Sequence, residues 1–467
     1  MADLIIKNGK IVDHRGIYNA AIVIKDGKIE NIVSESNLPS ANKIIDAHGN
    51  LVMPGIIDPH QHLGGISPLD DDILTETRSA AAGGVTTVIS LLRRRYKETG
   101  EVPIGPYLPK KDRLREIVNT KASVDTTFNA GIEDDEQIGE ISRYVREMGL
   151  TSFKFTKGYR PHFADDRLLY IGMNAIRDLG PPSMMMVHCE NLDIVEYLRE
   201  KLIKEGRSDL AAYTEAAPGF VEAEVMNRMM YFSMITRCPL YIPHVTIEEG
   251  VEMAARYRSM GVPVITESCP HYLTFTKDSQ FGPLGMINPP LRDKSDQAAL
   301  WLGIKNGIID CMGSDHVPNK KAQKTVMFEG TARSWQGVAT ILPVMLSEGV
   351  NKSRISLERL VEVCSFNPAK AFGLYPAKGV MQIGSDADFV IVDLHKKVKV
   401  TPEILHSASD YTLYDGWTME GWPVMTILRG NIVMENGEIV ASPGTGQYVH
   451  RMLDSDKAEI SKRESNG

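Results

Sequence analysis

Short apolar runs separated by turn residues occupy both ends of the chain. Near the amino terminus, four runs of strand length are Leu4–Ile6, Gly9–Val12, Ala21–Ile24 and Gly27–Ile29. Asp26-Gly27 between the last two is a hairpin signal. The same pattern returns in Ala387–Val392 and Thr426–Val433, each predicted to be one strand. We predict that residues 1–53 and 378–442 form one small β-sandwich domain built by both chain ends, followed by a polar, extended or partly disordered tail over 443–467 that is available for an oligomer contact.

The central residues 54–377 follow a different pattern, in which apolar strand-like runs alternate with helical segments. The runs include Val85–Ile89, Ser152–Phe155, Met184–His188, Leu240–His244, Val262–Thr266 and Gly307–Met312. The predicted helices include 134–149, 191–205, 220–236 and 247–259. Repeated strand–helix units predict an α/β fold, a (β/α)8 barrel of the TIM type. A doubly wound open sheet is the alternative, because periodicity alone does not show closure, although no GxGxxG motif follows the first strand.

The composition is ordinary for a globular protein, with 43% hydrophobic and 24% charged residues among 467. The net charge of −8 argues against binding to nucleic acid or to an anionic membrane, because both need a basic surface. We see neither a signal peptide nor an apolar stretch of membrane-spanning length. The five cysteines have no CxxC spacing, which is typical of free thiols, so we expect a cytoplasmic protein.

Six residues with metal-binding chemistry lie at or near the ends of the predicted strands. His60 and His62 are two positions apart, a spacing that points both rings to one face of a strand. Along the chain follow Lys154, inside an apolar strand, then His188, His244 and Asp315. In a barrel the carboxyl ends of the strands converge on one mouth, where catalysis is usually located.

These residue types suit a pair of divalent cations. Neutral imidazoles and carboxylates are ligands for Zn²⁺ and related ions, and two ions need an anionic bridge. A buried lysine reacts as the free amine, so Lys154 can supply that bridge once CO₂ converts it to a carbamate. Taken singly, a histidine at a strand end is more often structural, and a lysine more often lies at the surface. The six together predict a binuclear metal site.

On these motifs the sequence resembles the cyclic amidohydrolases, the hydantoinase and dihydropyrimidinase group with allantoinase and dihydroorotase as relatives. Pro54–His62 is similar to the first metal motif of that family, and Thr151–Lys154 to the segment with the carbamylated lysine. The later motifs match at Val187–Asn191, Ile242–Val245, Gly313–His316, Asn367–Lys370 and Gly384–Asp388. The resemblance covers nearly the whole chain.

The resemblance implies a role for each residue. His60, His62 and Asp315 would hold one metal, His188 and His244 the other, with carbamylated Lys154 as the bridge. The metals would be Zn²⁺, with Mn²⁺ or Co²⁺ as alternatives. Asp315 would carry a proton from the bridging water to the leaving nitrogen, and Tyr159 would hydrogen-bond the oxyanion. Asn288 and Arg333 lie where the family contacts the substrate ring, and related enzymes are dimers or tetramers, which implies a homo-oligomer.

Some positions depart from the family pattern and leave the substrate open. Leu63-Gly64-Gly65 stands where dihydroorotase has the arginine that grips a carboxylate. The hydantoinase group usually has serine at the position of Asn288 and asparagine near that of Arg333. The run Ser268–Leu273 is closer to allantoinase, whereas Gly349–Leu360 is closer to the hydantoinases.

Basic residues gather near the predicted mouth. Arg93-Arg94-Arg95 follows the strand that ends at Ser90, and Lys157 and Arg160 flank Tyr159. Such a cluster indicates a small substrate with an anionic or strongly polar substituent. The alternative is that these residues form surface ion pairs or a subunit contact.

The leading hypothesis is a metal-dependent hydrolase that opens a hydantoin or dihydropyrimidine ring, a cyclic amide or imide, to an N-carbamoyl amino acid by a metal-bridging hydroxide. An allantoinase-like ureide hydrolase is the nearest alternative. A non-catalytic scaffold is a second, but such relatives lose metal ligands, whereas all six are present here. A one-metal deaminase on the same fold is disfavoured by Lys154.

Overall fold

The computed structural model describes residues 1–93, 107–157, 164–328 and 334–465 of the chain. Eight parallel strands form its central sheet in the order β15-β14-β13-β12-β11-β10-β9-β8. Their bounds are β8 Ile56–Gln61, β9 Val85–Leu92, β10 Asp125–Gly131, β11 Ser152–Lys157, β12 Met184–Cys189, β13 Leu240–Ile242, β14 Val264–Ser268 and β15 Cys311–Met312. This order, with every neighbour consecutive in sequence, is that of a barrel rather than of a doubly wound sheet.

The first and last strands approach each other, so the barrel is nearly closed. Gln61 at the end of β8 forms a parallel bridge with His316, which lies just beyond β15. The backbone N–H of His62 donates to the carbonyl oxygen of His316 at 2.9 Å. The predicted α/β class and TIM-like barrel are confirmed.

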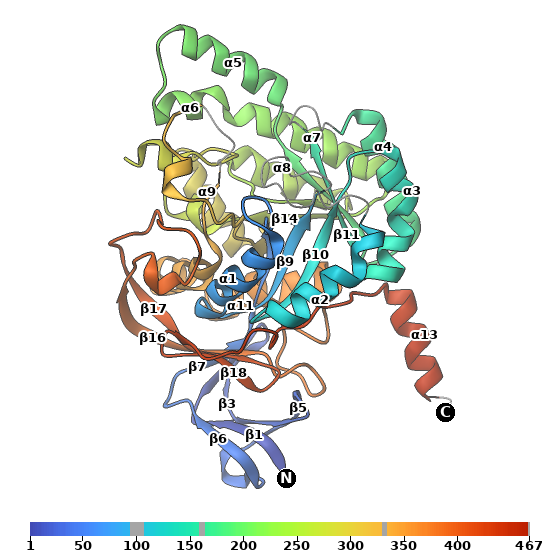
Figure 1. Cartoon of the computed structure of the whole chain (residues 1–467), viewed down its shortest axis with the longest axis vertical. Helices are drawn as coiled ribbons and strands as arrows, with labels where there is room; N and C mark the ends of the chain where they lie inside the picture. The colour runs from blue at the N-terminus through green and yellow to red at the C-terminus, as the bar shows by residue number, and fades with distance from the viewer. Residues whose placement is uncertain (94–106, 158–163, 329–333, 466–467) are drawn as a thin grey trace.

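Helices surround the barrel, and α5 and α6 project from its upper end (Figure 1). The helices are α1 Leu69–Ala82, α2 Lys111–Lys121, α3 Asp135–Arg143, α4 Asp166–Leu179, α5 Leu192–Lys204, α6 Leu210–Ala216, α7 Gly219–Thr236, α8 Glu248–Ser259, α9 Lys294–Lys305, α10 Ile341–Val344, α11 Leu357–Val361 and α12 Asn367–Ala371. The barrel interior holds a separate apolar cluster that includes Ile57, Ile89, Met184, Met186 and Tyr241. Strand residues between them, such as Met185 and Val187, pack outward in the core shared with the helices.

Both chain ends contribute to two further sheets below the barrel (Figure 1). One has the order β5-β4-β1-β6 and the other the order β19-β18-β17-β16-β7-β2-β3. Their strands are β1 Ala2–Lys7, β2 Lys10–Asp13, β3 Gly16–Asn19, β4 Ala21–Lys25, β5 Lys28–Val33, β6 Ala41–Asp46, β7 Leu51–Pro54, β16 Phe389–Lys399, β17 Thr418–Leu428, β18 Asn431–Glu435 and β19 Glu438–Ile439. One apolar cluster joins the two sheets, for example through Leu4, Ile24, Phe389 and Ile427. The domain boundaries at 53/54, 377/378 and 442/443 stay a prediction.

Two local predictions about the carboxyl-terminal part were wrong. Thr426–Val433 is not one strand, because Arg429 and Gly430 have φ of 45° and 75° and turn the chain from β17 into β18. The tail was predicted to be extended or partly disordered, but only its first part is extended: Arg451 is buried against the barrel, and residues 454–465 form the helix α13 (Asp454–Ser465). The tail packs on the barrel because its backbone pairs with Thr126 in β10, whose N–H donates to the Gln447 oxygen at 2.9 Å.

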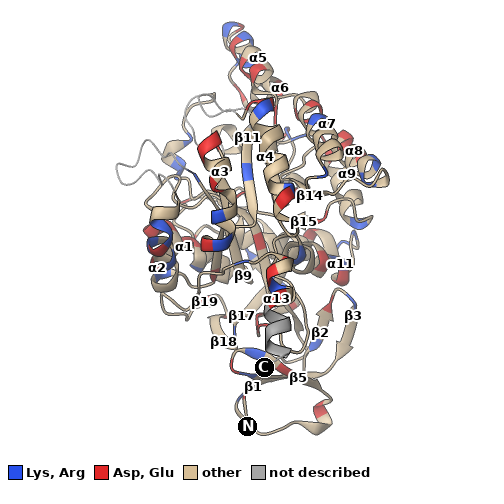
Figure 2. Cartoon of the chain, turned by 90° about the vertical axis from the view of Figure 1, so that its right-hand side faces the viewer, with Lys and Arg blue, Asp and Glu red and all other residues tan. Residues whose placement is uncertain are grey.

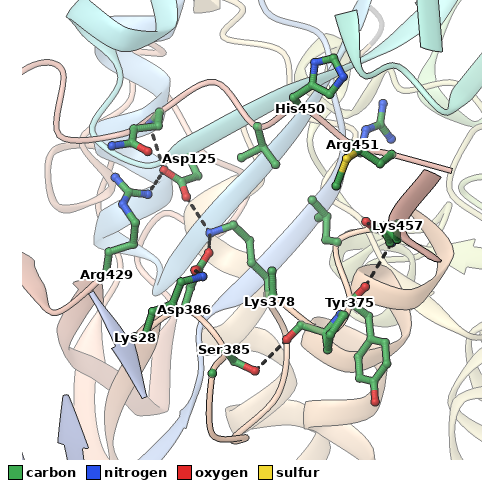
Figure 3. A pocket seen from close by; sticks show the side chains of 18 of the residues that line it. Lys28, Asp125, Tyr375, Lys378, Ser385, Asp386, Arg429, His450, Arg451 and Lys457 are labelled. Carbon is green, nitrogen blue, oxygen red and sulfur yellow. Dashed lines mark hydrogen bonds and ion pairs between the residues drawn. The ribbon is translucent and has the colours of Figure 1, made fainter. Parts of the chain in front are cut away.

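A charged cluster joins the barrel, the two sheets and the tail at the amino ends of the barrel strands. The Lys378 ammonium lies 2.6 Å from Asp125, 2.9 Å from Asp386 and 2.7 Å from Asp388. Figure 3 shows Lys378, Asp125 and Asp386 facing one another, and these residues line a pocket whose volume is about 710 Å³. The three carboxylates are close enough to hold a cation, and the lysine ammonium serves as that cation.

Charges of both signs lie side by side on the outer helices of the face shown in Figure 2. Within the described ranges, none of the helices combines the length and the apolar character that a membrane span requires.

Candidate metal centre

The six predicted ligands lie at the carboxyl end of the barrel, away from the two sheets of the chain ends. β8 starts directly after β7, so its far end, with His60 and then His62, points away from them. Lys154 lies on β11 and His188 on β12, whereas His244 and Asp315 follow β13 and β15. All are buried except His62, which is partly buried. The strand ends predicted to converge do so.

Two of the six residues have an uncommon backbone conformation. His244 has a φ of 43° and Asp315 a φ of 48°. Both values lie in the left-handed region, which residues other than glycine rarely adopt. Such conformations are retained where the surrounding structure imposes them, and they cluster at functional sites. Here they turn the chain just after β13 and β15, where these side chains enter the mouth.

The first group of candidate ligands is centred on Asp315. Its Oδ1 lies 3.3 Å from His60 Nε2 and 2.9 Å from His62 Nε2. Lys154 Nζ lies 2.6 Å from the same nitrogen of His60. One ligand atom each from His60, His62 and Asp315 falls within 4.8 Å of the others, close enough to share one cation.

The second group is a histidine pair. His188 Nδ1 and His244 Nε2 face each other at 2.9 Å, and the rings of His60 and His244 have centroids 5.4 Å apart. His188 Nε2 lies 2.8 Å from a carboxylate oxygen of Glu190. With the ring proton on Nε2, where Glu190 accepts it, the lone pair of His188 Nδ1 is directed at His244. The two groups are therefore adjacent, with His60 between them.

Burial sets the protonation of these groups. It lowers the pKa of His60 to about 3 and those of His62 and His244 well below their usual range, so the imidazoles are neutral and can act as ligands. Burial also lowers the pKa of Lys154 to about 8, because the nearby Asp315 charge offsets only part of the desolvation. Near neutral pH, Lys154 is therefore the free amine far more often than an exposed lysine is.

Glu267, which the sequence reasoning missed, orients His60. Its Oε1 lies 2.9 Å from His60 Nδ1, and its Oε2 accepts from the Tyr241 hydroxyl at 2.6 Å. The proton on Nδ1 therefore leaves Nε2 as the lone-pair nitrogen facing Asp315 and Lys154. Burial raises the pKa of Glu267 to about 8, so the ionised form needs a positive charge nearby. Its signal in the sequence was an acidic residue directly after the apolar run that ends at Thr266.

Asp58 is a second residue that the sequence reasoning missed. It links the segment that carries His60 to Ser314, the residue before Asp315, by hydrogen bonds. It accepts from the backbone N–H of Ser314 at 3.0 Å and of His60 at 3.2 Å, and from the Ser314 hydroxyl and the Gln61 amide. Burial raises the pKa of Asp58 to about 6, although all of these hydrogen bonds oppose the shift. Its position inside the motif before His60 was visible in the sequence, but its structural role was not.

The predicted substrate contacts are only partly described. Asn288 is present, and its side-chain oxygen accepts a hydrogen bond from the Tyr213 hydroxyl on α6. Tyr159, Arg333, Arg94, Arg95 and Arg160 lie outside the described residues, as does the side chain of Lys157. Arg93 is described and is partly buried.

The residues present fit a pair of divalent cations. Neutral imidazoles with lone pairs aimed inward, together with one buried carboxylate, are the donor set that zinc prefers. A carbamate on Lys154 would add an anion, so that with Asp315 and Glu267 three negative charges would balance most of the four positive ones of two divalent ions. The metal-ligand roles themselves stay a prediction.

The chain is similar to known proteins over almost its whole length. Residues 51–433 match the model of the amidohydrolase family, and residues 1–53 match the amino-terminal domain of the urease alpha subunit. The L-hydantoinase of Paenarthrobacter aurescens is 35% identical, over 97% of this chain and 98% of its own length. The D-hydantoinase of Geobacillus stearothermophilus is 34% identical over 98% and 99%.

Solved structures lead to the same group. The dihydropyrimidinase of Brevibacillus agri superposes with a TM-score of 0.89 at 30% identity, over 97% of this chain and 99% of that one. A D-hydantoinase crystal structure superposes with a TM-score of 0.88 at 34% identity and the same coverage. The chain belongs to the hydantoinase-like branch of the amidohydrolase family.

Proposed function

We propose that this protein hydrolyses an amide bond of a small cyclic amide or imide, a hydantoin or dihydropyrimidine, and releases an N-carbamoyl amino acid. The observation that carries the proposal is the convergence of four histidines, one lysine and one aspartate at the barrel mouth. It occurs in a chain that matches hydantoinases over almost its whole length.

The proposed cofactor is a pair of divalent cations, Zn²⁺ first and Mn²⁺ or Co²⁺ as alternatives. His60, His62 and Asp315 would hold one ion, His188 and His244 the other, and a CO₂-derived carbamate on Lys154 would contact both. When bound, the ions supply Lewis acidity and lower the pKa of water enough for it to attack at neutral pH. The buried Lys154 amine supports the carbamate, because the free amine is the form that reacts with CO₂.

The protein's own groups would position the ring and move the proton. Asp315 is the proposed general base and acid, since its carboxylate lies at the centre of the first ligand group. Asn288 is proposed to contact the ring amide, with its side chain held by Tyr213. By resemblance, Tyr159 would donate to the oxyanion and Arg333 would contact the ring.

A substrate panel tests the proposal. Enzyme loaded with Zn²⁺ or Mn²⁺ in bicarbonate buffer is offered racemic 5-substituted hydantoins, dihydrouracil and allantoin, and ring opening is followed by chromatography. Racemates are needed because L- and D-hydantoinases match this chain equally well. We expect N-carbamoyl products from hydantoins or dihydrouracil, and loss of turnover in Asp315→Asn.

Other outcomes would replace the proposal. Turnover of allantoin alone would assign the ureide hydrolase instead. A folded protein that binds no metal and opens none of these rings would favour the non-catalytic scaffold. Two metal ions per chain, measured by elemental analysis, would support the enzyme.

We also propose a cytoplasmic homo-oligomer, a dimer or tetramer. All five cysteines are free and buried, which suits a reducing compartment. Sedimentation velocity of the purified chain tests the oligomeric state, and a monomer at micromolar concentration would contradict it.

A further inference from the structure

Arg93 lies at the mouth of the barrel, one residue beyond the end of β9. The pairing of Ser90 in β9 with Gln61 in β8 brings this end level with the segment that carries His60 and His62. Ile89 belongs to the apolar cluster of the barrel interior. Because side chains alternate along a strand, Arg93 continues the inward-facing series of Ile89. Its side chain therefore starts from the inner wall of the mouth.

The charge of Arg93 reaches the candidate metal centre. After burial, which has the largest effect, the Arg93 guanidinium is among the charges that lower the pKa values of His60 and His62. It also lowers the pKa of Lys154. Since Arg93 is only partly buried, a molecule in the mouth can contact it.

Two other arginines with restricted exposure, Arg292 and Arg258, each have a carboxylate partner, whereas the buried Arg451 donates to backbone oxygens and to Ser152. Arg292 pairs with Glu222 at 3.0 Å, and Arg258 pairs with Asp310. Across residues 1–93, 107–157, 164–328 and 334–465, Arg93 has no ion pair, hydrogen bond or ring contact. A partly desolvated cation with no counter-ion is unfavourable, unless a ligand brings the anion.

We infer that Arg93 is a specificity-determining residue that binds a carboxylate on the substituent of the cyclic amide substrate. This rests on the ring-opening activity proposed above. The scissile amide has to lie against His60 and Lys154, so the carboxylate belongs to the group attached to the ring. The planar guanidinium presents two parallel N–H donors, which match a carboxylate. The substrate class is thus a hydantoin or dihydropyrimidine with an acidic side chain.

A different use of Arg93 makes a different prediction. Ring opening creates a new carboxylate at the reacting carbon, and Arg93 near the centre would favour that group in every substrate. Loss of its charge would then slow neutral and acidic rings equally. If Arg93 determines specificity, only kcat/KM for the acidic ring should fall when the charge is removed.

Matched substrates separate these cases. The metal-loaded enzyme is assayed with 5-carboxymethylhydantoin, with the corresponding carboxamide and with unsubstituted hydantoin. The variants are Arg93→Met, which removes the charge and keeps an unbranched chain, and Arg93→Lys, which keeps the charge. Arg78→Met, at an exposed position of α1, is the control for the same change of charge. Metal content and thermal unfolding of each variant are measured alongside.

We expect kcat/KM for the carboxylate to exceed that for the carboxamide in the parent enzyme. Arg93→Met should lower the carboxylate value by about 10- to 100-fold, the range for a charge-assisted pair, with the neutral rings changed by less than about threefold. Arg93→Lys should restore part of the loss, and Arg78→Met should change nothing. Equal loss on all rings, or a parent enzyme that prefers the carboxamide, would overturn the role of Arg93 while the proposed function stands. Turnover of none of these rings, together with no turnover in the substrate panel that includes dihydrouracil, would overturn both.

Discussion

Replacing Glu267 with glutamine removes one negative charge from behind the candidate metal centre and changes little else. The side chain is fully buried, and the glutamine amide has almost the same size and shape as the carboxylate. Its oxygen can still accept from His60 Nδ1 at 2.9 Å, while its NH₂ group can donate to the Tyr241 hydroxyl, which rotates to accept. The substitution therefore isolates the charge of Glu267 from its packing.

The expected loss follows from what that charge does. A carboxylate behind a metal-bound histidine makes the imidazole a better donor, and removing such a partner costs about 10- to 100-fold in metal affinity, or about 1.4 to 2.8 kcal/mol. Glu267→Ala should cost more, because the buried N–H of His60 would have no acceptor. Tyr241→Phe should cost less, because the hydroxyl contacts Glu267 and none of the candidate ligands in the described structure.

The assay is a competition between the protein and a zinc chelator of known affinity, followed by equilibrium dialysis and elemental analysis. Circular dichroism and thermal unfolding of the metal-free variants show whether the fold is retained. A Glu267→Gln protein that keeps zinc affinity within twofold of the parent would refute the reasoning, since Glu267 would then be a packing residue only.

Three further outcomes follow from the structure. Lys154→Ala should lose the metal pair, because the proposed bridge is gone, and two metals per chain in the variant would contradict the carbamate. Lys378→Met should lower the free energy of unfolding by about 3 kcal/mol, because the buried carboxylates of Asp125 and Asp388 lose their ammonium partner. Urea unfolding measures this loss, with Lys399→Met at an exposed position of β16 as the control. A difference between the two variants below about 1 kcal/mol would contradict the prediction. Tyr213→Phe should raise KM for a ring substrate several-fold with kcat nearly unchanged, because the side-chain oxygen of Asn288 loses this hydrogen bond. An unchanged KM would contradict a role for this hydrogen bond in holding Asn288 against the ring.

The candidate ligands could be predicted because simple periodicities place them. A spacing of two on a strand sends His60 and His62 to one side, and parallel strands in a barrel bring their ends together, so residues far apart in sequence become neighbours. The hairpin at Asp26-Gly27 was predictable for a similar reason, since both residues adopt positive φ, 50° and 72°, as that turn requires.

What could not be predicted depends on contacts distant in sequence. β10, Asp125–Gly131, is polar enough to escape notice, yet every residue in it is buried. Its Asn129 donates to the Pro59 oxygen at 3.2 Å and accepts from Ser152. Ser152 in turn accepts from Arg451 of the tail at 2.9 Å. The Asn129 side chain of β10 is thus hydrogen-bonded through Ser152 to a tail residue more than 300 positions later, Arg451. The local sequence of β10 therefore does not predict a buried strand.

Two buried lysines at opposite ends of the barrel, Lys378 and Lys154, have pKa values shifted in opposite directions. Burial alone lowers the pKa of any lysine, but at the amino end Asp125, Asp388 and Asp386 outweigh it and raise the pKa of Lys378 above its usual value. At the carboxyl end, Lys154 has Asp315 near it but also the positive charge of Arg93, and its pKa falls to about 8. The first lysine is therefore a permanent cation that joins the barrel to the sheets of the chain ends. The second stays partly a free amine in the mouth, the form that the proposed carbamate requires, and the number of carboxylates around each side chain decides the difference.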